Sequence, residues 1–190
     1  NSYESETFVP QEDAEDSSNL TCRYKTSVIA NNRLNVGNVM QNGEIFGDRM
    51  IKSPINKYNI LPKSSFVDVA INDGDEITAL AYYKDKLLQY KKRKVFVINI
   101  SGDFEFLEDT FENAGVLQQS CVTKTPYGIV WANKSGCYMY NGSQLVNLID
   151  NKIPVYEVAG YQNNFWNVGE RVPSIAYSEK DDVVLVTQDC

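Results

Sequence analysis

The sequence predicts an all-β fold, a β-propeller-like array of about four four-stranded antiparallel blades that forms part of a larger propeller. A strand-turn-strand unit returns every ~45–50 residues, which is the period range of propeller blades. The 12 tyrosines, together with the other aromatic and β-branched residues, suit half-buried strands. Helical periodicity is weak and is confined to short stretches near 109–115 and 147–153.

The repeating unit has four copies, and each copy consists of two short apolar runs around a polar tip. The copies begin at Ser27, Thr78, Cys121 and Ser174, and their tips lie at 31–33, 84–86, 126–128 and 178–181. Ala30, Ala81 and Ala176 occupy the same place in three copies. The wider gap between the last two alanines leaves room for the third copy.

Further strands complete the blades. The first hairpin is followed by expected strands at 49–53 and 66–71, with a loop rich in Pro, Asn and Ser at 54–65. The second blade continues with strands at 95–100 and 104–107. In the third, Asn141-Gly142 is a type I′ hairpin signal between two apolar runs. A four-stranded meander per blade follows, and strand positions Ile29, Leu80, Val130 and Ile175 are predicted to be buried.

The chain divides into an acidic, flexible N-terminal segment (1–20) and a β-propeller-type domain (21–190), which is expected to be a fragment of a longer chain. The stretch from Glu4 to Asp16 carries acids and no base, as linkers do. The formal net charge of −7 disfavours nucleic-acid binding by phosphate neutralisation. No apolar run is long enough to span a membrane.

Residues able to carry chemistry are few. Histidine is absent and the four cysteines lack CxxC spacing, which disfavours a zinc site. Cys121 and Cys137 lie in apolar strand patterns and are expected to be buried free thiols. No pairing of a nucleophile with a base stands out. The sequence therefore predicts no catalytic residue, no metal site and no cofactor, and hence no enzyme.

Three polar features have a structural and a functional interpretation. The basic run 91–94 lies between two strands and is expected to be a solvated hairpin tip, with contact to DNA in a channel as the alternative. The acidic run 72–76 is expected to be a turn, with a Ca²⁺ site as the alternative. Asn-X-Ser/Thr sequons at Asn19, Asn133 and Asn141 would accept glycans in a secreted protein, although turn chemistry explains the last two equally well.

Six runs carry a family resemblance, namely 49–58, 73–80, 86–91, 95–98, 128–132 and 136–142. They resemble the propeller virion proteins of tailed bacteriophages, which are the head-completion or stabilisation proteins and the tail tubular or nozzle proteins of short-tailed phages. The resemblance implies a structural component of the phage tail or neck at the portal-to-tail channel, without enzymatic activity. It also implies a homo-oligomeric ring that contacts portal, adaptor or tail proteins and, transiently, channel DNA.

A carbohydrate-binding or glycosidase-like propeller module is the alternative function. Such an enzyme needs paired carboxylates at a defined separation, and the repeated Ser-x-Asp-x-Gly-x-Thr-Trp box of sialidases is absent from the sequence. The aromatic residues between 138 and 166 could stack on a sugar, but core packing explains them too.

Two segments interrupt the blade pattern, the loop at 54–65 and the stretch at 153–171, which is rich in Tyr, Asn, Phe and Trp. Insertions in a repeat array map to loops on one face, which is often the binding face. We therefore expect Tyr161, Phe165 and Trp166 to contact an adjacent subunit or a partner protein.

Overall fold

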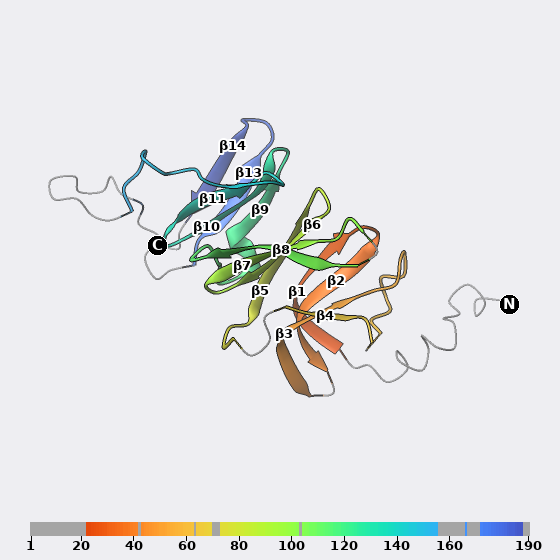
Figure 1. Cartoon of the computed structure of the whole chain (residues 1–190). Coiled ribbons are helices and arrows are strands. Elements are labelled where there is room, and N and C mark those ends of the chain that lie inside the picture. The colour runs from red at the N-terminus through yellow and green to blue at the C-terminus, as the bar shows by residue number, and fades with distance from the viewer. Residues whose placement is uncertain are drawn as a thin grey trace.

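A computed structural model describes residues 22–41, 43–62, 64–69, 73–102, 104–155, 166 and 172–187. Its strands form three four-stranded antiparallel sheets and one two-stranded sheet (Figure 1). These residues contain no α-helix and one 3₁₀ turn, η1 (Gln119–Cys121). The predicted all-β architecture of repeated antiparallel sheets is confirmed, and the predicted N-terminal segment 1–20 lies outside the described residues.

Each sheet is a meander in chain order, here called a blade. Blade 1 contains β1 (Cys22–Ala30), β2 (Arg33–Gln41), β3 (Glu44–Lys52) and β4 (Phe66–Asp68). Blade 2 contains β5 (Ile77–Tyr83), β6 (Lys86–Lys91), β7 (Lys94–Asn99) and β8 (Phe106–Glu112). Blade 3 contains β9 (Val122–Thr125), β10 (Gly128–Asn133), β11 (Gly136–Tyr140) and β12 (Leu145–Asn147). Blade 4 is the hairpin of β13 (Ser174–Ser178) and β14 (Val183–Thr187).

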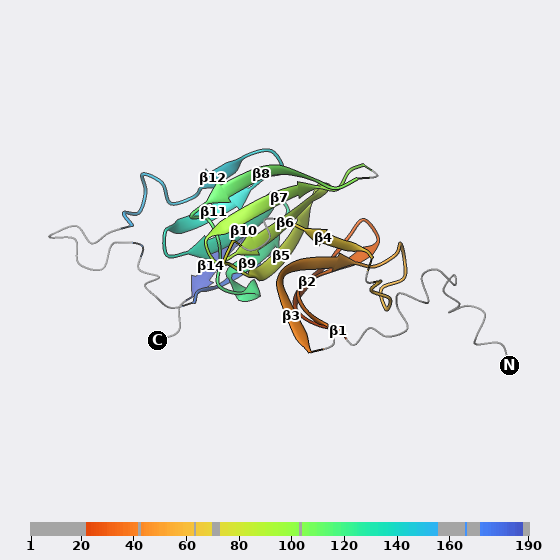
Figure 2. The same cartoon turned by 60° about the horizontal axis from the view of Figure 1, so that its bottom comes forward.

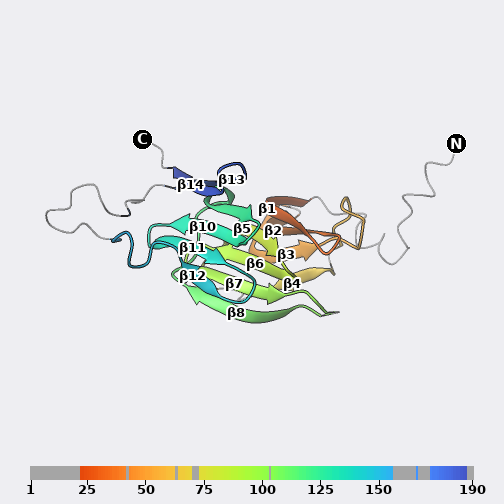
Figure 3. The same cartoon turned by 90° about the horizontal axis from the view of Figure 1, so that it is seen from above.

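The first strands of successive blades are neighbours. Strand β1 contacts β5, β5 contacts β9, and β9 contacts β13. Figures 2 and 3 show the sheets following one another from the orange N-terminal blade, through the green one, to the teal and blue ones. In a radial arrangement of blades, the innermost strand of each blade contacts the innermost strand of the next, and the contacts here follow that order. The described part of the chain forms an open array of such blades.

An apolar core fills each space between two blades. Between blades 1 and 2 it contains Ala30, Met50, Ile77, Leu80, Leu87 and Ile98. A larger core between blades 2 and 3 is built around Tyr90 and Trp131. Between blades 3 and 4 it includes Val130 and Ile175. Because blade 2 is covered on both faces, nearly every residue of β5 is buried.

The predicted burial of Leu80, Val130 and Ile175 is confirmed, whereas that of Ile29 is wrong because its side chain is 58% exposed. Neighbours along a strand point to opposite faces. Val28 and Ala30 face blade 2, so Ile29 points to the other face of blade 1. The repeat pattern identified the strand correctly but could not tell which of its faces has a neighbour.

Two further differences concern segments between the repeats. The short helix expected near 109–115 is wrong, because most of this stretch belongs to β8, which pairs with β7. The loop at 54–65 is partly explained by blade packing. Its Leu61 packs against Val36, Val39 and Ile51 on the face of blade 1 that points away from blade 2.

Candidate functional site

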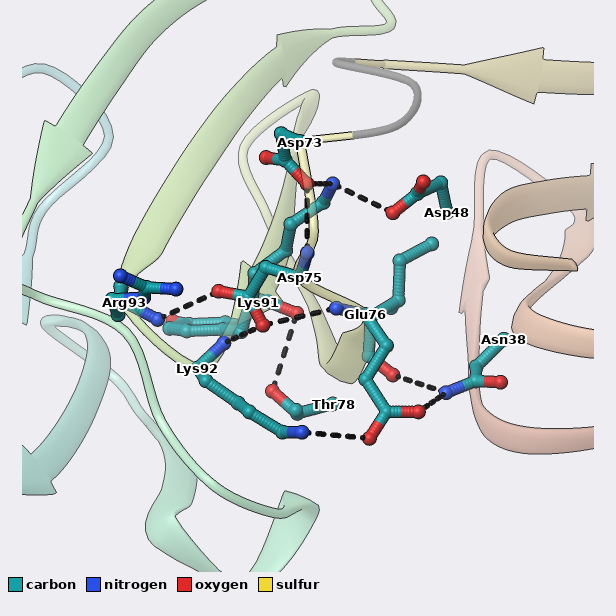
Figure 4. A network of polar contacts seen from close by, with 11 residues as sticks. Asn38, Asp48, Asp73, Asp75, Glu76, Thr78, Lys91, Lys92 and Arg93 are labelled. Atoms are coloured by element: carbon teal, nitrogen blue, oxygen red, sulfur yellow. Dashed lines mark hydrogen bonds and ion pairs between the residues drawn. The ribbon is translucent and has the colours of Figure 1, made fainter.

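A buried lysine ties blade 1 to blade 2. The Nζ atom of Lys91 lies 2.8 Å from Oδ1 of Asp48 and 2.7 Å from Oδ1 of Asp73 (Figure 4). Asp48 is on β3 in blade 1, whereas Asp73 is in the turn that precedes β5. The side chain of Lys91 is 0% exposed. A buried ammonium requires charged or hydrogen-bonding partners, and here two carboxylates supply them.

This arrangement corrects the prediction of a solvated hairpin tip at 91–94. Lys92 and Arg93 are exposed, but Lys91 is the last residue of β6 and is fully buried. A run of like charges need not share one environment: here the strand ends at Lys91, and Lys92 and Arg93 form the exposed turn before β7. The acidic run at 72–76 was the sequence signal that could have identified one partner of Lys91, Asp73.

The described part of the acidic run, 73–76, forms the predicted turn, with Gly74 at a φ of +76°. The carboxylate of Asp75 accepts hydrogen bonds from the backbone N–H groups of Lys92 and Arg93, at 3.2 and 3.1 Å. Glu76 accepts from Nδ2 of Asn38 at 2.7 Å and pairs with Lys25 at 3.0 Å. Among the described residues, no group of three or more carboxylate or cysteine side chains could hold a metal ion.

These contacts lower the pKa values of Asp73 and Glu76. The hydrogen bond from Asn38, followed by that from Lys25, lowers the pKa of Glu76 to about 2. Burial raises the pKa of Asp73, but the hydrogen bonds from Lys91 and from the Asp75 N–H outweigh it, so the net pKa is lowered. A general acid at neutral pH needs a raised pKa. The cluster is therefore suited to holding two blades together rather than to proton transfer.

The interface between blades 2 and 3 is aromatic. Trp131 on β10 is fully buried and meets Tyr90 on β6 edge to face, with ring centroids 5.3 Å apart. Its indole Nε1 donates to the carbonyl oxygen of Ala114 at 2.7 Å. Edge-to-face pairs of this kind add to the stability that burial of the rings provides.

Tyrosine hydroxyls link the hairpin tips of adjacent blades. Between blades 1 and 2, the Tyr82 hydroxyl donates to Oδ1 of Asn31 at 2.8 Å. Between blades 2 and 3, the Tyr83 hydroxyl donates to the carbonyl of Pro126 at 3.0 Å. Between blades 3 and 4, the Tyr127 hydroxyl donates to Oδ2 of Asp182, also at 3.0 Å. All three interfaces are thus tied at the tips of their inner hairpins.

Both cysteines with described side chains are buried free thiols, as predicted. Cys121 lines a cavity of about 380 Å³ between blades 2 and 3, whose rim carries Lys92, Arg93 and Lys134. Its Sγ donates to the carbonyl of Pro173 at 3.2 Å. Burial raises the pKa of Cys121 and raises that of Cys137 to about 11. Both thiols therefore stay protonated at neutral pH and are poor nucleophiles.

Of the three residues predicted to form an interface, Trp166 is described and is half-buried. Its indole Nε1 donates to the carbonyl of Asn133 at 2.8 Å, and its ring packs against the core between blades 3 and 4. Tyr161 and Phe165 lie outside the described residues. Contact of these three side chains with another subunit stays a prediction.

The side-chain amide of Asn133 forms hydrogen bonds within the fold. Its Nδ2 donates to the carbonyls of Gly115 at 2.8 Å and Asn113 at 3.2 Å, and so connects blade 3 to the chain leaving blade 2. A glycan on this nitrogen would replace one of its two hydrogens and so remove at least one of these bonds. The structure therefore favours turn chemistry over glycosylation for this sequon, whereas Asn19 lies outside the described residues.

Sequence reasoning missed an exposed apolar patch on blade 2. Phe104, Phe106 and Leu107 are 85%, 54% and 49% exposed. They lie on β8, the outer edge strand of the blade, or just before it. We call these three residues the β8 patch. Alternation of apolar and polar residues is weak here, so the sequence predicted a strand without indicating which face it exposes.

No protein-family model matches this chain, and no curated protein matches it. The resemblance to phage propeller virion proteins is thus carried by the sequence runs alone. No helix among the described residues is long and apolar enough to cross a membrane.

Proposed function

We propose that this chain is a non-catalytic structural domain of a tailed-phage virion, placed at the portal-to-tail channel as a head-completion or tail nozzle component. It acts by ring assembly and by contact with other virion proteins. The β8 patch is the observation that carries the protein-contact part of this proposal. The position in the virion comes from the sequence resemblance.

The β8 patch suits protein contact because it combines exposed aromatic rings with a sheet edge. Phe104 and Phe106 are two residues apart and both exposed, and exposed apolar side chains that gather on a surface mark sites of protein interaction. Aromatic residues are also enriched in interface cores. Lys86, on the same sheet, forms an ion pair with Glu108 of β8. Charges of this kind protect an edge strand from non-specific pairing, so the patch favours a specific partner over aggregation.

The state of the acids also supports a structural role. A glycosidase needs two carboxyl groups that face a substrate, one of them with a raised pKa. Asp73 and Glu76 have lowered pKa values and face cations of the protein itself. This region of the molecule therefore favours a scaffold over the glycosidase-like alternative.

The decisive experiment locates the protein in the particles of the phage that encodes it. We expect mass spectrometry of purified virions to detect the chain, and a cryo-EM reconstruction to place its sheets at the junction of portal and tail. Absence of the chain from purified particles would overturn the proposal. So would hydrolysis of any member of a panel of oligosaccharides by the purified protein.

A paired variant tests the β8 patch. Changing Phe104 and Phe106 to Ser should lower incorporation into virions by about tenfold, equivalent to ~1.4 kcal/mol of contact energy. The matched control is Ile45→Ser, which alters another exposed apolar side chain on a different blade. Circular dichroism should show both proteins folded. Equal incorporation of the two variants would remove the patch from the proposal.

A further inference from the structure

Blade 4 has an apolar face that the described residues leave uncovered. Leu185 is 53% exposed and Val183 is 41% exposed. On the opposite face of the hairpin, Ile175 and Val186 pack into the core shared with blade 3. Since side chains alternate along a strand, Val183 and Leu185 point away from blade 3.

Blade 2 shows what covers the equivalent face elsewhere in the molecule. Ala81 on β5 pairs with Leu88 on β6, just as Ala176 on β13 pairs with Leu185 on β14. Both residues of the blade 2 pair are buried because blade 3 packs its β10 strand, including Trp131, against the same cluster. Because neighbouring repeats cover each other in the same way along an array, we expect the face around Leu185 to fit another antiparallel sheet with an apolar face.

The complementary surface lies at the other end of the array. Ile29 on β1 is exposed and points away from blade 2, and its strand neighbour Leu34 is only partly buried. Leu61 covers Val36 and Ile51 on this face but leaves Ile29 accessible. Contacts between blades are made mainly by the innermost strands, as between β1 and β5. An exposed Ile29 on an innermost strand is thus placed where a preceding blade would pack.

We propose that these two surfaces bind each other between two copies of the chain, the Leu185 face of one copy packing on the Ile29 face of the next. The inference rests on the proposed ring assembly and names the surfaces that would carry it. Contact between two different faces is heterologous, and it closes into a ring when the rotation between copies allows.

Charges at the hairpin tips agree with this pairing. Each interface between described blades is tied at its tips by a tyrosine hydroxyl. In the proposed contact, the tip of blade 4 would meet the tip of blade 1. The former carries Glu179, Asp181 and Asp182 against one lysine, and the latter carries Arg33 and no acid. Opposite charges at an interface favour the correct partner and orientation.

The first experiment measures self-association of the full chain by sedimentation velocity over a range of concentrations. We expect concentration-dependent association that Leu185→Lys and Ile29→Lys each weaken by at least about tenfold, as loss of an apolar anchor does. The matched control, Ile45→Lys, changes a similarly exposed isoleucine on β3, at the level of Arg23 and so at the far end of blade 1 from Ile29, and should associate like the unmodified chain. Circular dichroism checks that each variant folds. A monomeric unmodified chain at every concentration would overturn the inference.

The second experiment mixes the two face variants. The Leu185→Lys copy keeps an intact Ile29 face, and the Ile29→Lys copy keeps an intact Leu185 face. An equimolar mixture should therefore form one-to-one heterodimers and nothing larger. Failure of the mixture to associate would show that each face binds itself or something else, and would sink the inference. Detection of the chain in virions tests the proposed function separately, so the two failures can be told apart.

Discussion

The interface between blades 1 and 2 and that between blades 2 and 3 share one topology but differ at their centres. The first is organised around the ammonium of Lys91, held by Asp48 and Asp73. The second is organised around Trp131, packed against Tyr90. Both interfaces also contain aliphatic cores and a tip tyrosine. One repeated architecture thus accepts either an ion-paired or an aromatic connection between neighbouring blades.

The two connections should respond differently to perturbation. A buried ion pair gains little net stability, because desolvation offsets the attraction, but removal of one partner strands a buried charge. Aromatic packing is less directional and does not titrate in the acid range. The ion-paired interface should therefore be sensitive to pH and to single charge deletions, and the aromatic one to loss of volume.

The largest effect is expected at the aromatic interface. Trp131→Ala should lower the free energy of unfolding by ~3–5 kcal/mol, because it empties a large buried volume. Urea unfolding followed by circular dichroism measures this change. Trp131→Phe serves as the control. It also removes the bond to the Ala114 carbonyl, but it should lose less stability than Trp131→Ala because it keeps an aromatic ring in the core. Equal losses in the two variants would show that the hydrogen bond, not the packing, dominates.

A smaller loss is expected at the ion-paired interface. Lys91→Met should cost ~1–3 kcal/mol, less than deletion of one partner in a fully buried pair, because both aspartates are partly exposed. The triple variant Lys91→Met, Asp48→Asn, Asp73→Asn removes all three charges and should recover most of the loss. Urea unfolding of both proteins checks this. A triple variant as unstable as the single one would show that unpaired aspartate charges are not the cause of the loss.

The contrast between these interfaces also shows how far the sequence alone could reach. Period-2 apolar runs and polar tips predicted the strands and the burial of Leu80 and Val130, because those properties depend on nearby residues. The burial of Lys91 depends on Asp48, which lies on another blade and carries no local signal. The exposure of Ile29 likewise depends on whether a neighbouring blade covers it.

The candidate site was less predictable than the fold for the same reason. The basic run 91–94 was identified, but Lys91 ends strand β6 and is buried, whereas Arg93 lies in the exposed turn between β6 and β7. Trp166 was selected as an interface residue, and the structure places it against the core between blades 3 and 4. The β8 patch was missed because exposure on an outer edge strand follows from the topology of the whole sheet.

A pH titration sharpens the comparison further. The pKa of Glu76 is about 2 in the folded protein, against a usual value of 4.5. A depressed pKa stabilises the fold above the unfolded-state value, and that stability is lost as pH falls from about 4.5 towards 2. Glu76→Gln should flatten this part of the profile of unfolding free energy against pH. The charge-matched control Glu112→Gln, on the more exposed Lys94 pair, should keep the acid loss. A steep loss that persists in Glu76→Gln would assign it to other carboxylates.

The smallest effects are expected at the tyrosine links, which occur at both interfaces and so compare them directly. Tyr82→Phe removes a solvent-exposed bond to Asn31 and should cost about 0.5 kcal/mol, the lower end for a hydrogen bond. Tyr83→Phe removes a bond to the Pro126 carbonyl from a buried side chain and should cost about 1 kcal/mol or slightly more, because the carbonyl loses its partner. Each change removes one hydroxyl, so packing is nearly constant in both variants. Urea unfolding in parallel gives the difference. A larger loss for Tyr82→Phe would mean that the exposed link between blades 1 and 2 contributes more to stability than the buried link between blades 2 and 3, against the ranking that burial predicts.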